Sequence, residues 1–393
     1  MKSIKKLIIS IAVCLSVATN VVSFASCDML MNGGASSESE SVESASDLEA
    51  SVSEELEESL ESEENSEEEE NSEESIADSE SEEEEDAEVD FSTLGHTHVW
   101  VDGACEVCET ELIKRDGNYM YFGEYPQSLK AEGVRVAEEA SENGYYVGED
   151  GAYYAKVVAT PYALEYKFDN GSSVVEGDTY YFKVEPIRWT ILRENTTDGT
   201  VKLFCNNVIF AMSYQDDYYY NTSNQIYYTT ANGAPNGTYA NNYKYSAVRQ
   251  WLIEEFYNTA FDETQQALMQ TMFIDNSAST TIKDINPYAC ENTNDKVTLL
   301  SFKDSINTAY GFQKYAITED AARMLKTTDF ARAIGAWSST SGRFLGNGTW
   351  MLRSPYPEES SHVTQGERSG KTNVSVSMDI KDSGVAPVIT IAI

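Results

Sequence analysis

The segment that most constrains this chain is an uninterrupted acidic tract. Residues 36–90 contain 27 Asp or Glu side chains and no Lys or Arg. Like charges repel one another, and a stretch made mainly of Glu and Ser has too few apolar residues to form a core. We therefore predict that residues 36–90 are a disordered acidic stalk and that the globular fold follows them. The alternative interpretation of the tract is a segment that binds divalent cations weakly.

The acidic tract also accounts for most of the charge of the chain. The formal net charge is -39. Outside the tract, 39 acidic residues face 27 basic ones, which leaves a mildly acidic protein with a net charge of -12. Nucleic-acid binding requires clustered Lys and Arg side chains, and we find no such cluster after the first six residues. We therefore expect no nucleic-acid partner.

The first 26 residues have the pattern of a secretory signal peptide. Lys2, Lys5 and Lys6 precede a run of apolar and small residues from Leu7 to Val22. A positive start, a short apolar stretch and small residues before a cleavage point are the marks of such a signal. An uncleaved membrane anchor is the alternative, although the run is short and interrupted by polar residues. No later stretch is apolar enough to cross a bilayer.

Cys27 is a candidate lipidation site. Residues 24–27 are similar to a bacterial lipobox, with Phe24 where Leu is usual. In that interpretation Cys27 is diacylated, residues 27–35 lead into the stalk, and two acyl chains hold the protein at the extracellular face of the cell membrane. In the alternative, cleavage after Ala25 releases a secreted protein.

A compact group of His and Cys residues follows the stalk. Within residues 94–112, His96, His98, Cys105 and Cys108 give the spacing H-x-H-x6-C-x2-C. Four nitrogen and sulfur ligands suit a tetrahedral structural Zn²⁺, and Gly103 allows a turn between the two halves. The pattern resembles the small zinc-ribbon-like elements of Gram-positive surface proteins. A Cys105–Cys108 disulfide and a redox-active pair are the alternatives, and no thioredoxin-like context supports the second.

Residues 117–393 have the length and hydrophobic patterning of a globular domain. Apolar spacing predicts a helix from Ser246 to Asn258, with Ser246 as its cap. The remaining expected elements mix strands and helices without βαβ alternation, which indicates an α+β fold. They are helices over Glu263–Met272 and Glu319–Leu325, the latter capped by Thr318, and strands over Tyr119–Phe122, Tyr180–Val184, Ile187–Leu192, Val201–Cys205, Val297–Ser301, Val374–Ile380 and Val388–Ile393.

Several motifs of this domain resemble a bacterial family of unknown function, the DUF6273 domain, found in surface proteins. They are Tyr119–Ser128, Asp178–Trp189, Asn242–Leu252, Asn292–Ser301, Thr328–Ala333, Trp350–Pro355 and Gly384–Pro387. The resemblance covers residues 117–393. It implies a C-type-lectin-like fold, shared with formylglycine-generating enzymes (sulfatase-modifying factors), with much loop. Within it we expect Trp189, Trp251 and Trp350 in the core, and Arg353 paired with a carboxylate that holds a loop, a ligand contact being the alternative for Arg353.

One segment has the composition of a binding surface. Ser213–Tyr245 holds nine Tyr and six Asn. Tyrosine offers flat apolar area with a polar tip, which suits sugar or protein recognition, although an insertion that packs on itself is the alternative. The ligand-binding candidates are Tyr218, Tyr219, Tyr220, Tyr227 and Tyr228.

No catalytic motif is evident, so we expect no enzymatic activity. Formylglycine-generating enzymes use a pair of C-terminal cysteines, and this chain has no cysteine after Cys290. Cys205 and Cys290 form either one disulfide or two buried free thiols. The function expected from the sequence is therefore a surface-displayed, lectin-like module that binds a glycan, cell-wall or protein ligand. The alternatives are an enzyme with altered chemistry and a purely structural envelope protein.

Overall fold

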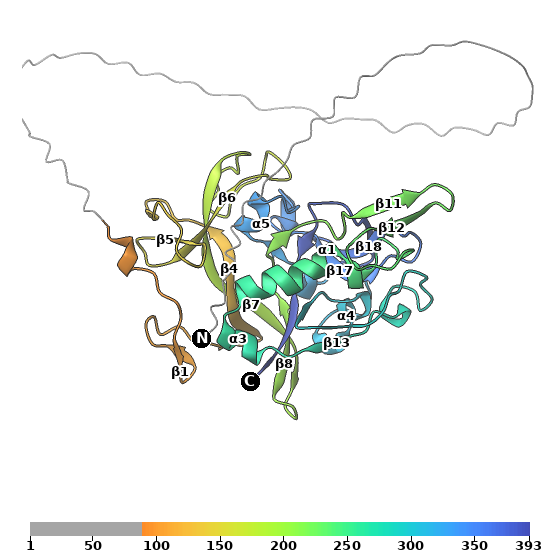
Figure 1. The fold of residues 1–393 in the computed structure, drawn as a ribbon, viewed down its shortest axis with the longest axis horizontal. Helices are drawn as coiled ribbons and strands as arrows, with labels where there is room; N and C mark the ends of the chain where they lie inside the picture. The colour runs from red at the N-terminus through yellow and green to blue at the C-terminus, as the bar shows by residue number, and fades with distance from the viewer. Residues whose placement is uncertain (1–88) are drawn as a thin grey trace, which may run out of the picture. The chain divides into compact units, whose positions relative to one another are not determined.

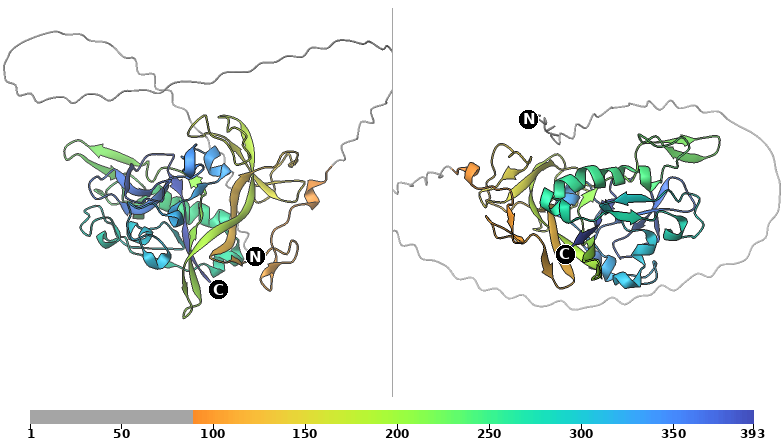
Figure 2. Two further views of the ribbon diagram at one scale, coloured as in Figure 1. Left: turned by 180° about the vertical axis from the view of Figure 1, so that it is seen from behind. Right: turned by 60° about the horizontal axis from the view of Figure 1, so that its bottom comes forward.

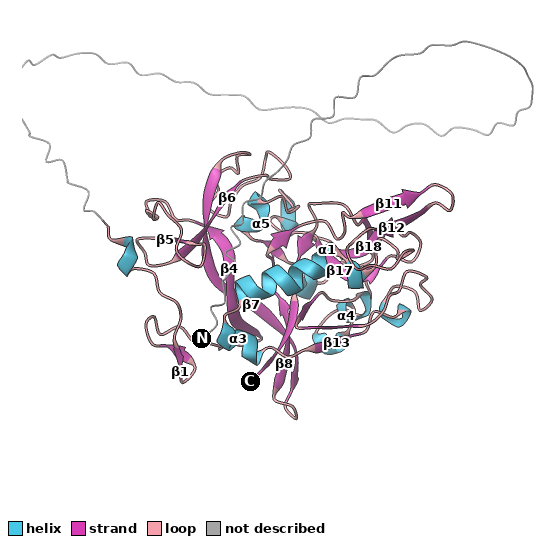
Figure 3. Cartoon of the chain, in the orientation of Figure 1, coloured by secondary structure: helices cyan, strands magenta, loops and turns pink. Residues whose placement is uncertain are grey.

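A computed structural model describes residues 89–393 of the chain. The predicted signal peptide, Cys27 and all of the stalk up to residue 88 lie outside the described residues. The described residues, 89–393, belong to one compact unit. It is a mixed α+β structure with many strands, few and short helices and much loop (Figure 3). No helix among residues 89–393 is long and apolar enough to cross a membrane.

An antiparallel eight-stranded sheet organises the fold (Figure 1). Its main path runs in the order β15-β21-β8-β7-β4-β3, and β6 pairs with both β7 and β5. The strands are β3 (Lys114–Asp116), β4 (Tyr119–Leu129), β5 (Tyr146–Val147), β6 (Tyr153–Val158), β7 (Thr179–Asn195), β8 (Thr200–Cys205), β15 (Val297–Thr298) and β21 (Val388–Ala392). The C-terminal strand β21 thus lies beside β8, which comes from the first part of the folded unit.

The long strand β7 covers two ranges that were predicted as separate strands. Tyr180–Val184 and Ile187–Leu192 are one strand that continues through Pro186. Proline has no N–H to donate, so it is tolerated in a strand only where a partner is missing. The pairing of β7 with β6 ends at Lys183 and its pairing with β8 starts at Trp189, so Pro186 has a neighbour only on the β4 side.

The other strands form small sheets around the main one. A three-stranded sheet has the order β17-β18-β19, and each of the remaining sheets has two strands. These strands are β17 (Trp350–Pro355), β18 (His362–Gly366), β19 (Val374–Ser377), β1 (Trp100–Val101) with β2 (Ala104–Cys105), β9 (Asn207–Val208) with β16 (Lys326–Thr327), β10 (Phe210–Ala211) with β20 (Gly384–Val385), β11 (Tyr218–Asn221) with β12 (Ile226–Thr229), and β13 (Met272–Ile274) with β14 (Thr293–Asp295). Of these two-stranded pairs, only β9 and β16 run parallel among the described residues.

The predicted helix after Ser246 is confirmed. α1 (Ala247–Trp251), a π-helical turn over Leu252–Phe256 and α2 (Tyr257–Ala260) run on as one helix. The Ser246 side chain caps it by accepting the N–H of Arg249. The other helices are α3 (Glu263–Leu268), α4 (Phe302–Ser305) and α5 (Asp329–Ala333). α3 is shorter than predicted because Met269 is already extended and forms a bridge to Ile391 of β21.

The predicted helix over Glu319–Leu325 is wrong. Only a 3-10 turn forms there, over Ala321–Arg323, and its cap is Asp320 rather than Thr318. The guanidinium of Arg323 is fully buried and donates to the carbonyl of Ser305 and the hydroxyl of Thr372, as well as to the carbonyl of Thr318. These tertiary hydrogen bonds hold the preceding backbone in an irregular path and outweigh local helix propensity.

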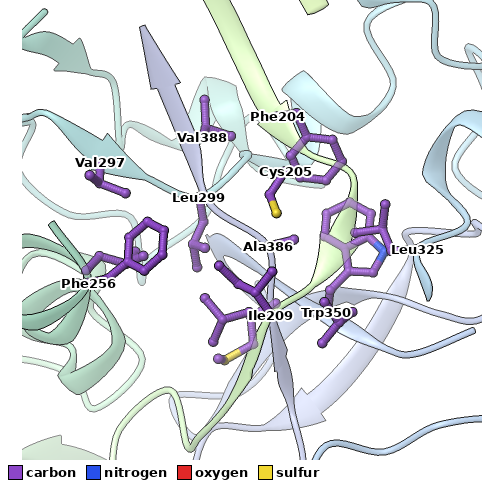
Figure 4. Packing of buried hydrophobic residues seen from close by; sticks show 14 of the residues in the cluster. Phe204, Cys205, Ile209, Phe256, Val297, Leu299, Leu325, Trp350, Ala386 and Val388 are labelled. Carbon is purple, nitrogen blue, oxygen red and sulfur yellow. The ribbon is translucent and has the colours of Figure 1, made fainter. Parts of the chain in front are cut away.

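The hydrophobic core lies between the main sheet, the α1–α2 helix and the β17–β18 strands. Figure 4 shows Phe204, Trp350 and Ala386 packed around Cys205. Trp189 and Trp350 are completely buried, as predicted, and Trp251 nearly so. The predicted structural role of Arg353 is also confirmed, because it pairs with Asp304 at 2.8 Å and donates to the carbonyl of Leu299.

Candidate functional site

The Cys/His element, residues 94–112, is built on a tight hairpin. Strands β1 and β2 pair through the register Trp100↔Cys105, which leaves Asp102 and Gly103 as a two-residue turn. Both turn residues have positive φ, 52° and 85°, the geometry that Asp-Gly favours in hairpins. A second turn follows, in which Glu109 donates its N–H to the carbonyl of Cys105. The two turns bring Cys108 back beside the segment that carries the histidines.

The structure brings the four predicted ligands together. One ligand atom from each of His96, His98, Cys105 and Cys108 lies within 4.8 Å of every other. Two sulfur–nitrogen pairs, Cys105 Sγ–His96 Nε2 and Cys108 Sγ–His98 Nδ1, are each 3.5 Å apart. A tetrahedral Zn²⁺ with Zn–S of about 2.3 Å and Zn–N of about 2.0 Å separates sulfur and nitrogen by roughly 3.5 Å. The group therefore has the donor set and spacing to hold a metal ion.

Glu124 of strand β4 extends this group on the side of His98. Its Oε1 lies 3.3 Å from His98 Nε2, while the other ring nitrogen, Nδ1, faces Cys108. A carboxylate on the free nitrogen of a metal-binding imidazole fixes the ring and makes it a better donor. Sequence reasoning missed Glu124, because it lies outside the Cys/His motif and meets His98 only through the fold.

The charges around the group favour thiolate. Burial alone would raise the pKa of Cys105, but hydrogen bonds from the backbone of Cys108 and Val107 and from the side chain of His98 lower it to about 5. The hydrogen bond to Glu124 raises the pKa of His98 to about 9, although burial opposes it. Thiolate is the form of cysteine that binds metal ions, so Cys105 offers the required ligand at neutral pH.

Trp100 joins the element to the rest of the folded unit. Its ring stacks on His98 with centroids 4.7 Å apart, and its Nε1–H donates to Asp262 Oδ2 at 2.5 Å. Asp262 also caps helix α3, where its side chain accepts the N–H of Gln265. The imidazole of His98 is therefore held between a carboxylate of β4 and an indole anchored at α3.

The aromatic hairpin, strands β11 and β12, carries the five predicted ligand-binding tyrosines. It projects from the unit in every view (Figures 1 and 2). Tyr219 pairs with Tyr228 and Tyr220 with Tyr227 across the strands. Tyr219 and Tyr220, on opposite faces, are 46% and 44% exposed. The structure thus presents tyrosine rings to solvent on both faces of the hairpin.

Two of the five tyrosines have structural contacts. Tyr218 and Tyr227 are partly buried and pack against the core. The Tyr218 hydroxyl donates to Asp379 Oδ2 at 2.6 Å, and this bond raises its pKa to about 12. The N–H of Tyr227 donates to Ser360 Oγ. These contacts fasten the hairpin on the face that carries Tyr218, Tyr220 and Tyr227, so Tyr219 and Tyr228 on the other face are the better placed to meet a ligand.

Cys205 and Cys290 are free thiols in the structure, as are Cys105 and Cys108. Cys205 lies in the core, where burial raises its pKa to about 12. Cys290 is partly exposed, and burial raises its pKa as well. Cys205 and Cys290 are therefore held in their unreactive protonated form. The remaining histidine of the domain, His362, contacts Glu359 at 2.8 Å.

A polar cleft of about 120 Å³ borders Ser128, Asp169 and Asp329. Asp329 is buried there and accepts the N–H groups of Leu129 and Asp169. It also pairs with Arg332, which contacts Asp169 at 2.5 Å. Because these contacts join β4, the loop at Asp169 and helix α5, we assign Asp329 a structural role.

Comparison with known families places a domain of unknown function, DUF6273, at residues 198–393. The match is shorter than the 117–393 resemblance and leaves out the motifs of strands β4 and β7. Those strands nevertheless pair with each other and, through β7, with β8 inside the matched range. Neither the curated proteins nor the solved structures that were searched include a match to the chain.

Proposed function

We propose that the chain is an exported, lipid-anchored surface protein whose folded unit binds a ligand through the aromatic hairpin. The observation that supports this most is the projecting pair of strands with exposed tyrosine rings on both faces. Tyrosine contributes rigid apolar area with a hydrogen-bonding tip and loses little side-chain entropy on binding. In this proposal Cys27 carries the lipid and the acidic stalk holds the domain away from the membrane.

The lectin-like interpretation of the fold belongs to the same proposal. It is supported by the antiparallel sheet that joins the C-terminal strand to a much earlier one, and by the long loops between short helices. Loops carried on a rigid sheet are common binding surfaces, since the sheet fixes their position while their sequence varies.

The binding role is tested with the full chain and isolated bacterial cell envelopes. We expect the protein to sediment with envelopes or to bind a glycan array. Replacing Tyr219 and Tyr228 together by Ala should remove this binding and leave the thermal unfolding midpoint unchanged. If neither envelopes nor any arrayed glycan bind the unsubstituted protein above background, the proposed function is wrong.

We further propose that the Cys/His element holds one structural Zn²⁺. The 3.5 Å sulfur–nitrogen distances support this assignment, as do the four protein ligands, which fill a tetrahedral site and leave no position for a substrate. The ion would stabilise a segment in which Cys105 is the one buried residue between 89 and 112.

Metal analysis tests the zinc assignment directly. We expect one zinc per chain in the purified protein, and a Co²⁺-substituted sample should show the visible absorption of tetrahedral thiolate coordination. The Cys108→Ser variant should lose both signals, whereas Cys290→Ser should keep them. A protein without zinc that contains a Cys105–Cys108 disulfide would contradict the assignment.

Lipid attachment is tested by labelling growing cells with palmitate. Incorporation into the natural chain and its loss in Cys27→Ala are the expected results. A protein recovered from the medium without lipid would instead support simple secretion.

The enzyme alternative has a separate test, since oxygen uptake with thiol-containing peptides by the full chain would favour it over a binding role.

A further inference from the structure

The exposed Tyr219 belongs to a longer row of rings that crosses four segments of the chain. This inference rests on the proposed binding function and concerns the class of ligand. The ring centroids of Tyr219 and Tyr228 are 5.6 Å apart. Those of Tyr228 and Tyr239 are 5.9 Å apart, and the planes of these two rings are nearly parallel. Tyr288 closes the end of the row, edge-on to Tyr239 at 4.9 Å. We call these four residues the tyrosine row.

The backbone pairing explains why the rings line up. Tyr219 is directly opposite Tyr228 in the β11–β12 ladder, and Tyr228 forms a bridge to Tyr239 on its other side. Directly opposed residues project from the same face of a sheet. Three rings from three neighbouring segments therefore lie side by side across the strands.

The segment that supplies these three rings is uncharged. From Tyr218 to Tyr239 the chain contains no Asp, Glu, Lys, Arg or His, although charged residues make up 24% of the whole sequence. Its polar groups are hydroxyls and amides, such as the Asn224 side chain that donates to the Tyr228 hydroxyl at 2.8 Å. At the far end, burial and Tyr239 raise the pKa of Tyr288, and the Glu359 carboxylate adds to the shift. Glu359 therefore places a carboxylate near that end of the row.

These features decide between classes of ligand. A polyanion bound along the row would meet no Lys, Arg or His side chain between Tyr218 and Tyr239. At the Tyr288 end it would meet the carboxylate of Glu359. A basic peptide would find no carboxylate between Tyr218 and Tyr239. A sugar chain presents apolar C–H faces that pack on aromatic rings and hydroxyls that bond to amides and phenols. The ring centroids of Tyr219, Tyr228 and Tyr239 follow one another at 5.6 and 5.9 Å, so consecutive sugar units can each contact one ring.

We propose that the tyrosine row binds an unbranched, neutral polysaccharide along its length. Tyr219, Tyr228 and Tyr239 supply the stacking surface, and Tyr288 closes one end of it. Asn224, through its bond to Tyr228, keeps that phenol in place for the ligand. The binding surface is thus one face of the aromatic hairpin together with Tyr239 and Tyr288.

The hairpin offers a matched control for this face. Tyr220 has nearly the same exposure as Tyr219 and lies next to it in the chain, but alternate residues of a strand point to opposite faces. Its ring lies 4.7 Å from Tyr227, outside the row. A ligand that stacks on the row contacts Tyr219 and not Tyr220.

The experiment is native affinity electrophoresis of the full chain through gels that contain hydroxyethyl cellulose, glycol chitin or polygalacturonate. We expect at least one of the two neutral polymers to slow the protein and the anionic polygalacturonate to have no effect. Tyr219→Ala and Tyr239→Ala should each weaken the retardation at least about tenfold, while Tyr220→Ala leaves it unchanged.

Calorimetry with oligomers of the retarding polymer should show affinity that rises with length and levels off once the oligomer spans the row.

Three results would overturn the ligand class and leave the hairpin as a binding surface. The first is equal loss of binding in Tyr219→Ala and Tyr220→Ala, and the second is retardation by polygalacturonate alone. Absence of retardation by every polymer, combined with Tyr219-dependent binding to envelopes, would also overturn the ligand class while the proposed function stands. Absence of binding in both assays overturns the two proposals together.

Discussion

The Cys/His element and the domain that follows it are held together by different interactions. Between residues 89 and 112 the only buried side chain is that of Cys105, and the ordered contacts converge on four metal-binding groups. In the domain, one continuous core of buried apolar residues extends from the main sheet to the β17–β18 strands. A short segment cannot bury enough apolar area to offset its loss of conformational entropy, whereas the domain can.

This difference indicates where each region is vulnerable. The element depends on a few strong, directional bonds, so loss of one ligand removes most of its stabilisation. The core depends on many weak contacts, so a single truncation removes a small share of the total. Two side-chain hydrogen bonds link the regions, Glu124 to His98 and Trp100 to Asp262. Separate substitutions can therefore measure how much the metal ligands, the core and the two links contribute to stability and metal affinity.

The largest effect is expected from removing a metal ligand. Structural zinc contributes an apparent binding free energy of about 10–16 kcal/mol in small zinc domains. In Cys105→Ser we expect hydrogen exchange to accelerate throughout residues 94–112, including the N–H of Leu112 that is bonded to Gly103. Exchange in strand β8 should be unchanged. Cys290→Ser is the matched control, and slow exchange in a metal-free element would show that another interaction holds it.

The second effect concerns the core. Trp350 is fully buried, and its ring lies so close to Gly366 that a Cβ there would approach it to 2.4 Å. Trp350→Ala should lower the free energy of unfolding by about 3–5 kcal/mol, measured by urea denaturation, because it leaves a large cavity. Zinc content should not change. Trp337→Ala, at a half-buried tryptophan, should cost clearly less, and equal losses would contradict this account of the core.

The sequence was informative where the determinants are local. The helix after Ser246 follows from the spacing of Val248, Trp251 and Phe256, and the capping role of Ser246 from its hydroxyl. The metal ligands are likewise close together in the chain. Such patterns act within one or two turns of backbone, so they can be recognised without knowledge of the fold.

The sequence was uninformative where distant segments meet. Glu124 and Asp262 support the Cys/His element from strand β4 and helix α3, and Tyr288 reaches the tyrosine row from a separate loop far beyond Tyr239. The false helix near Arg323 has the same cause, because its buried guanidinium donates to the carbonyl of Ser305 and the hydroxyl of Thr372. In each case a long-range contact decides the local structure.

A smaller effect is expected at the link between the two regions. Glu124→Gln keeps the size of the side chain but weakens the bond to His98 Nε2. Loss of a carboxylate partner typically reduces metal affinity by about 10- to 100-fold. Competition with a chromophoric chelator measures this change. Glu106→Gln removes the same charge from an exposed position inside the element, so an equal loss there would show a general charge effect instead.

The smallest effect is expected in acid and involves the domain alone. Asp304 lies beside Arg353 and Lys202, and although burial works in the opposite direction these cations lower its pKa to about 2. A depressed pKa in the folded state gives stability that is complete above the unfolded value near 4 and is lost as pH falls from about 4 to about 2. The expected loss is about 2 kcal/mol at most, measured by urea denaturation of the Cys105→Ser variant so that the metal site does not contribute. With Asp304→Asn in the same background, this part of the acid dependence should disappear. An unchanged acid dependence would assign it to other carboxylates.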